Sequence, residues 1–293
     1  MNIDINKKFS LRSETTDERA SSLSESRKGG AQRSWPGGDG AWKALSLPML
    51  AFLVLPLAAL VLRAAPVQVW SKLSSAAVHQ AIALSLTTAL ITTLTTVAFG
   101  TPLAYLLAHD GKGWRRVVET VIDLPTVLPP AVAGVALLMA FGRRGLFGGL
   151  LDSMGVQVTF TTAAVVLAQT FVASPYYIRS AITSFSEVDP ELRHSAALDG
   201  AGEWQIFRHV MAPIAWSGLL SGSVMAWARA MGEFGATIIF AGNFPGRTQT
   251  MPLAIYLGFE MDLNTALALS VILLASSFLT LLAVKSFLRK EKR

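Results

Sequence analysis

The sequence of 293 residues contains no cysteine, and its four histidines lack the spacing of a metal site. Disulfide bonds, thiolate nucleophiles and cysteine-ligated zinc or iron–sulfur centres are therefore excluded. The ATP-binding pattern GxxxxGKS/T and the catalytic patterns HExxH and GxSxG are also missing. We therefore expect a chain that is not an enzyme and that holds no metal or cofactor.

Charged residues are scarce as well. They make up 15% of the chain, against 52% hydrophobic residues, and the mean hydropathy is +0.47. This composition is typical of a protein embedded in a bilayer and nearly excludes a soluble enzyme. The excess of 25 Lys and Arg over 19 Asp and Glu is better explained by loops that face the cytoplasm than by nucleic-acid binding.

Long uncharged stretches identify the membrane spans, because about 20 apolar residues cross a hydrocarbon core of about 30 Å. Six stretches qualify, and the fifth continues past Arg229 and Glu233: residues 44–62, 81–108, 124–142, 153–178, 210–228 and 263–284. Proline lies in the first four, which predicts kinked helices whose freed carbonyls find partners in neighbouring helices. The sequence thus predicts an all-α membrane bundle of six transmembrane helices.

Basic residues indicate the orientation of this bundle. Of the 25 Lys and Arg, residues 1–43, 109–118, 179–208 and 285–293 carry 8, 3, 3 and 5. The positive-inside rule then places these segments, and both termini, in the cytoplasm. We divide the chain into a disordered tail (1–43), a first transmembrane helix with an outer loop (44–75) and a transmembrane domain (76–290).

The cytoplasmic segment 187–209, between the fourth and fifth spans, has its own local signals. Asp189 suits a helix N-cap, Pro190 the first helical position, and Glu191 the first turn. Residues 199–202, Asp-Gly-Ala-Gly, predict a stop in which glycine takes a positive φ. A second short helix is expected to follow, with an apolar face of Trp204, Ile206 and Phe207. A simple amphipathic interfacial segment would carry the same pattern.

The same segment resembles the coupling loop of bacterial ABC-importer permeases, in which Glu-Ala-Ala, three residues, Gly, nine residues and Ile-x-Leu-Pro follow one another. Ala196, Gly200 and Pro213 match, Val210 and Ala212 are mild changes, and His194 and Ser195 depart from the pattern. The resemblance implies type I permease architecture with cytoplasmic coupling helices. It also implies docking of an ATPase through Glu191, His194, Ser195, Ala196, Gly200, Ala201, Trp204, Phe207 and Pro213.

Further motifs look like the molybdate-type permease subunit over about residues 76–290; they lie at 124–130, 142–145, 228–237, 243–246 and 250–252. This resemblance implies import of molybdate, or of the nearly isosteric tungstate, across a bacterial inner membrane. The implied partners are a second copy of the chain, two ATPase subunits that bind ATP and Mg, a periplasmic or lipid-anchored oxyanion-binding protein, and membrane lipids. A sulfate or thiosulfate permease is the nearer alternative, and a non-transporting membrane scaffold or sensor is the more distant one.

Arg229 and Glu233 lie four residues apart in the fifth span, where an unpaired charge is costly, so we expect them to pair on one helical face. The pair is either structural or part of a translocation gate. The candidate pathway or gate residues are Arg229, Gly232, Glu233, Phe234, Gly235 and Thr237.

Two further features are open to two interpretations each. Arg143 and Arg144 are predicted on the outer side, against the positive-inside trend. They either raise the local concentration of an oxyanion or anchor to lipid phosphates and acidic partner residues. Gly218 and Gly222 form a GxxxG pattern, which favours packing within the chain over a dimer face.

Overall fold

The computed structural model describes residues 38–64, 75–109 and 113–291, and most of the predicted tail lies outside them. The chain divides into two units, Met1–Ala59 and Leu60–Arg293, and each is described by itself. Helix α2 (Gly38–Arg63), most of which belongs to the first unit, begins six residues before the predicted span. Almost every side chain along α2 is exposed, apolar ones included. Such a helix has the composition of a lipid-facing membrane anchor.

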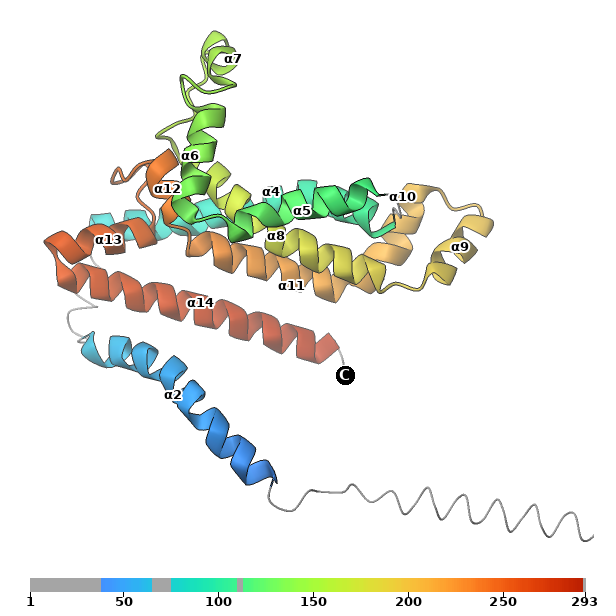
Figure 1. Cartoon of the computed structure of the whole chain (residues 1–293), viewed down its shortest axis with the longest axis horizontal. Coiled ribbons are helices and arrows are strands. Elements are labelled where there is room, and N and C mark those ends of the chain that lie inside the picture. The colour runs from blue at the N-terminus through green and yellow to red at the C-terminus, as the bar shows by residue number, and fades with distance from the viewer. Residues whose placement is uncertain (1–37, 65–74, 110–112, 292–293) are drawn as a thin grey trace, which may run out of the picture. The chain divides into compact units, whose positions relative to one another are not determined.

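The larger unit consists of helices in the part of the chain that the structure describes (Figure 1). In chain order these are α4 (Ala76–His109), α5 (Trp114–Val127), α6 (Pro130–Phe141), α7 (Gly148–Ser153), α8 (Thr162–Ser186), α9 (Pro190–Leu198), α10 (Glu203–Ile206), the π-helical turn η1 (Phe207–Met211), α11 (Ala212–Met231), α12 (Gly235–Phe240), α13 (Met251–Met261) and α14 (Leu263–Glu291).

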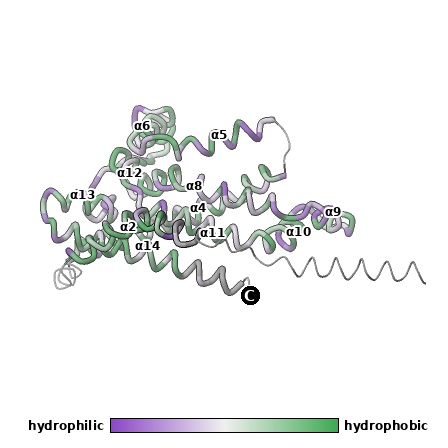
Figure 2. The backbone as a smooth tube through the Cα atoms, turned by 60° about the horizontal axis from the view of Figure 1, so that its bottom comes forward, coloured by the Kyte–Doolittle hydropathy of each residue, from purple (hydrophilic) through white to green (hydrophobic). Residues whose placement is uncertain are grey.

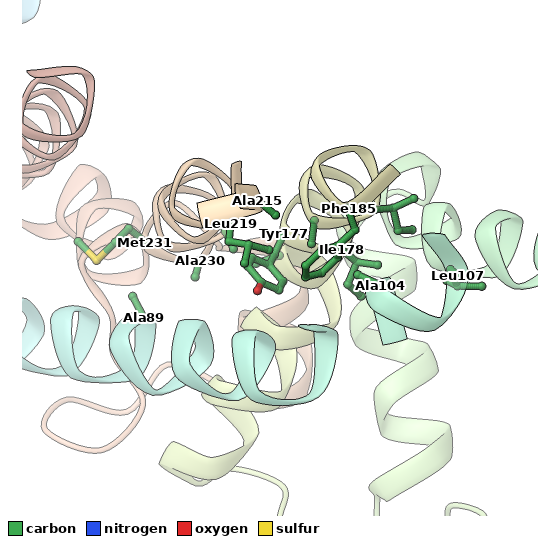
Figure 3. Packing of buried hydrophobic residues seen from close by; sticks show 14 of the residues in the cluster. Ala89, Ala104, Leu107, Tyr177, Ile178, Phe185, Ala215, Leu219, Ala230 and Met231 are labelled. Carbon is green, nitrogen blue, oxygen red and sulfur yellow. The ribbon is translucent and has the colours of Figure 1, made fainter. Parts of the chain in front are cut away.

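The core of this unit lies where α4, α8 and α11 pack against one another. Small side chains such as Ala89, Ala104 and Ala230 are fully buried there and let the helix backbones approach closely (Figure 3). Tyr177 and Phe185 of α8 fill the larger spaces between them. A second cluster joins α6, α8 and α12. The three long helices therefore form the frame to which the other elements attach.

Gly218 and Gly222 lie where α11 packs closely against α8, which confirms packing within the chain. A Cβ atom on Gly218 would lie 1.7 Å from Ser184 Oγ, and one on Gly222 would lie 2.7 Å from Ser180 Cβ. Ser180 also donates a hydrogen bond to the Gly218 carbonyl, at 2.9 Å. The absence of side chains on this face of α11 is thus what permits the contact.

Gly218→Ala should lower the free energy of unfolding by about 1–3 kcal/mol, because the added methyl group forces α11 and Ser184 apart. Thermal unfolding of the purified protein in detergent measures the change. Gly149→Ala is the matched control, since a Cβ atom there meets nothing within 4 Å. Adding Ser184→Gly to Gly218→Ala should restore part of the stability, because glycine inside α8 itself costs about 0.5–1 kcal/mol. A double variant less stable than the sum of the two single changes would contradict the steric explanation.

Within the described residues, four helices have the length and composition of a membrane span: Trp42–Arg63, Ala76–His109, Glu203–Met231 and Leu263–Leu282. The predicted third span is not one straight helix. Its residues are divided between α5 and α6. The chain bends by 117° between these two helices, which count as a fifth candidate span only if taken together. The predicted fourth span begins late, because α8 starts at Thr162. The count of six spans remains a prediction.

Candidate functional site

Segment 187–209 lies at the end of the bundle where α4 and α8 terminate, opposite α12 and α13 (Figure 1). As predicted, Asp189 caps α9: its Oδ1 accepts a hydrogen bond from the Glu191 amide at 2.9 Å. Gly200 has φ +86°, the left-handed conformation expected of the stop. Hydrophilic residues concentrate on α9 and α10 (Figure 2). The local signals in this segment are therefore confirmed.

The predicted second short helix is not separate from the fifth span. Helix α10 runs through η1 directly into α11, so one apolar helix extends from Glu203 to Met231. A π-helical turn inside an α-helix is uncommon and often lies at a functional position. The segment that contains α10 is therefore continuous, through η1, with a candidate membrane span.

The residues expected to dock the ATPase are accessible on this segment. Glu191, His194, Ser195, Gly200, Trp204 and Pro213 are exposed, and Ala196, Ala201 and Phe207 are half-buried. The Trp204 ring stacks on Phe207, with ring centroids 5.4 Å apart, and remains 68% exposed. An apolar ring held in place and still accessible is suited to contact a partner protein.

Arg229 and Glu233 pair as predicted, with 2.8 Å between Arg229 Nη1 and Glu233 Oε2. The expectation that both lie on one helical face is wrong, because α11 ends at Met231 and Glu233 follows the helix. Glu233 is only 1% exposed, and its second oxygen, Oε1, accepts the Ala236 amide hydrogen at 2.8 Å. One buried carboxylate therefore joins the end of α11 to the first turn of α12.

The other gate candidates surround this corner. Gly232 caps α11, and the Phe234 ring lies 5.2 Å from Tyr256. A Cβ atom on Gly235 would lie 2.4 Å from Pro130 Cβ, so α12 rests directly on the start of α6. Thr237 is fully buried, and its hydroxyl has no hydrogen-bond partner among the described residues. The structure thus brings the six candidates together at one end of α11.

Arg143 and Arg144 lie between α6 and α7, and both are exposed. Arg143 lines a cleft of about 170 Å³ together with Asp152, Gln157 and Thr159. Arg144 is not part of the lining. The two arginines are therefore not equivalent, and Arg143 is the one placed to contact a group that enters this cleft.

An ion-pair network between α5 and α8 was not recognised as a site in the sequence. Arg179 of α8 donates to Asp123 Oδ1 at 2.7 Å and to Glu119 Oε2 at 3.2 Å, and it also contacts Asp123 Oδ2. Arg115 neutralises Glu119 from within α5, at 2.7 Å. The i, i+4 spacing of Glu119 and Asp123 in the sequence indicates that both lie on one face of a helix. Only the structure shows that Arg179 of α8 is their common partner.

Helix α5 turns this charged face toward α8 and its apolar face outward. Val117, Val121 and Val127 are 65%, 57% and 81% exposed. This arrangement inverts the usual amphipathic pattern of a soluble protein, and it suits a helix whose outer surroundings are apolar. In the described ranges, no three His, Asp or Glu side chains come close enough to hold a metal ion.

Residues 100–293 match the family described as the binding-protein-dependent transport system inner membrane component. The molybdenum transport system permease protein ModB of Mycobacterium tuberculosis is 41% identical over 241 residues, which cover 81% of this chain and 91% of the relative. The protein of the same name from Escherichia coli K12 is 38% identical over 178 residues, 60% of this chain and 78% of the relative. The sulfate permease protein CysT of E. coli K12 is 32% identical over 238 residues, 80% and 86% of the two chains.

Among solved structures, a chain of a bacterial ABC transporter involved in alginate import superposes with a TM-score of 0.70 at 16% identity, covering 89% of this chain and all of the other. A chain of the inward-facing MetNI methionine ABC transporter gives a TM-score of 0.57 at 18% identity, covering 74% and 96%. These likenesses show a shared fold. With the family match over residues 100–293, they lead to one conclusion: the chain belongs to the binding-protein-dependent transport system inner membrane components.

Proposed function

We propose that this chain is the permease subunit of an ATP-driven importer of molybdate. The observation that carries the proposal is 41% identity over 241 residues to a molybdenum transport permease, against 32% over 238 residues to a sulfate permease. Tungstate, a nearly isosteric dianion, would follow the same path. The chain itself hydrolyses nothing; ATP and Mg bind to a separate ATPase.

Two copies of the chain enclose the anion pathway, and two ATPase subunits dock beneath segment 187–209. Support for this arrangement comes from the exposed docking residues on α9 and α10 and from the continuous helix that leads from α10 into α11. Closure of the ATPase pair on ATP would move the two docking segments and shift the spans between inward-facing and outward-facing states. Both termini then face the cytoplasm.

At the opposite end of the bundle, an oxyanion-binding protein delivers the substrate. Arg143, exposed on the rim of its cleft, meets either the anion or an acidic residue of that protein. Deeper in the path, a free carboxylate would repel a dianion. The ion pair that neutralises Glu233 through Arg229 is compatible with a gate for anions.

Reconstitution of the chain with its ATPase and binding protein tests the proposal. ATP-dependent uptake into proteoliposomes should favour molybdate over sulfate when both compete. A preference for sulfate would instead indicate a sulfate permease, the alternative to which the 32% identity to CysT points. Uptake of neither anion, with the ATPase bound, would favour a scaffold or sensor instead.

Gly200→Ala should weaken ATPase binding about 5- to 30-fold, because a left-handed conformation costs an alanine about 1–2 kcal/mol. A Cβ atom at Gly200 meets nothing within 4 Å, so the effect comes from the backbone and not from a clash. Gly202→Ala is the control: Gly202 has φ −70°, which alanine adopts freely. Titration of labelled ATPase against both variants measures the difference, and equal weakening in the two would refute the explanation.

A further inference from the structure

Tyr105 of α4 contacts segment 187–209 and the end of α8 at the same time. Its ring lies edge-on to Phe185 of α8, with centroids 5.6 Å apart at 89°, and edge-on to Phe207 of η1, at 5.3 Å and 81°. Edge-to-face contacts at this separation are a preferred geometry for aromatic pairs. One side chain therefore holds together α4, α8 and the start of the helix that continues into α11.

The hydroxyl of Tyr105 extends this contact toward α9. It donates to Glu203 Oε2 at 3.4 Å, and Glu203 in turn accepts from Arg193 Nη2, at 3.2 Å to each carboxylate oxygen. Arg193 belongs to α9, Glu203 to α10 and Tyr105 to α4. A continuous series of contacts thus runs from the exposed helix α9 to the ends of two spanning helices.

We infer that Tyr105 is a positioning residue that holds segment 187–209 in one orientation relative to α4 and α8, so that the segment and the ends of both helices move as one body. The inference rests on the proposed function, because it takes this segment to be the ATPase docking surface. An exposed ion pair such as Arg193–Glu203 contributes little rigidity by itself. The packed rings of Tyr105, Phe185 and Phe207 supply the fixed point.

Spin-label distances test this inference directly, and the absence of cysteine makes site-specific labelling simple. One label is placed on α9 at Ala197→Cys and the other on α4 at Ala98→Cys, both at exposed positions. Labelled chain is diluted with unlabelled chain, so that each complex carries one labelled copy and the measured distance lies within that copy. Distances are measured in the complete complex with the ATPase, without nucleotide and with trapped ATP. The distance distribution should be narrow and the same in both states.

Tyr105→Leu should broaden this distribution and lower the uptake per ATP hydrolysed at least tenfold, while the ATPase stays bound and active. Tyr105→Phe keeps the rings and should keep the distribution narrow. Tyr176→Leu is the matched control, because Tyr176 lies half-buried on α8 with no ring contact or side-chain hydrogen bond among the described residues. If Tyr105→Leu prevents assembly, Phe185→Leu removes another ring of the same contact without altering a docking residue.

A distribution that shifts between nucleotide states without any substitution, or that stays narrow in Tyr105→Leu, would overturn the inference. Its failure is distinguishable from failure of the proposed function. If no variant imports molybdate but Tyr105→Leu alone broadens the distance, the positioning role stands and the assigned substrate is wrong.

Discussion

Glu233→Ala should lower the free energy of unfolding by about 3–5 kcal/mol, the usual cost of removing one partner from a buried ion pair. Glu233 is 1% exposed, and Arg229 has no other ion-pair partner in the part of the chain that the structure describes. The Ala236 amide also loses its acceptor at the first turn of α12. Thermal unfolding in detergent and the amount of protein in the membrane report this loss.

Three further variants test whether the loss of stability in Glu233→Ala comes from the ion pair with Arg229. Glu260→Ala, at an exposed carboxylate of α13, is the control and should change neither measurement. Glu233→Gln keeps an acceptor for Ala236 but leaves the charge of Arg229 unpaired, so it should fall between Glu233→Ala and the unchanged protein. Adding Arg229→Gln removes the unpaired charge and should recover part of the stability. If Glu233→Gln changes neither transport nor abundance, both the structural and the gating roles of the pair are refuted.

Arg179→Gln should release α5 from α8 and lower stability by about 1.5–3 kcal/mol, the range for lost hydrogen bonds to charged groups. Two carboxylates four residues apart, Glu119 and Asp123, would then face each other, and Arg115 would remain as a partner of Glu119 alone. Hydrogen exchange by mass spectrometry measures the change, since the amides of α5 should exchange faster while those of α8 stay protected.

Arg116→Gln is the matched control for this prediction. Arg116 also lies at the start of α5, but it is exposed and forms no ion pair among the described residues. Arg179→Lys keeps the charge and loses the two-pronged contact with Asp123, so it should restore only part of the protection. Equal exchange in Arg116→Gln and Arg179→Gln would show that the network does not hold α5 in place.

Local features of the functional segments could be predicted from the sequence. The cap at Asp189, the proline after it and the positive φ at Gly200 depend on a few neighbouring residues, and the structure confirms all three. The Arg229–Glu233 contact was predictable from the spacing of four residues and the cost of an unpaired charge in a span, although the helix ends between the two residues. The prediction that was wrong concerns the end of α11 at Met231, because the apolar residues around it do not indicate where the helix stops.

Features that depend on distant parts of the chain were not predictable. The prolines at positions 129 and 130 indicate an interruption of the helix. They do not give the bend of 117° between α5 and α6, nor the packing of α12 against Pro130 at that bend. The partners of Arg179 lie 56 and 60 residues away. The late start of α8 had a readable signal in Thr161, which caps the helix through the Ala164 amide, although the apolar residues before it favoured a longer span.

The same separation in sequence bears on the order in which the protein is synthesised. Helix α5 leaves the ribosome before Arg179, so for about 60 residues of further synthesis its two carboxylates have no partner on α8. At ribosomal speeds of roughly 5–20 residues per second this interval lasts about 3–12 s. During that time Glu119 has Arg115 of the same helix as a partner, whereas Asp123 waits for Arg179. The ion pairs that hold α5 against α8 can therefore form only after Arg179 has been synthesised, so they are a late contact in the assembly of the chain.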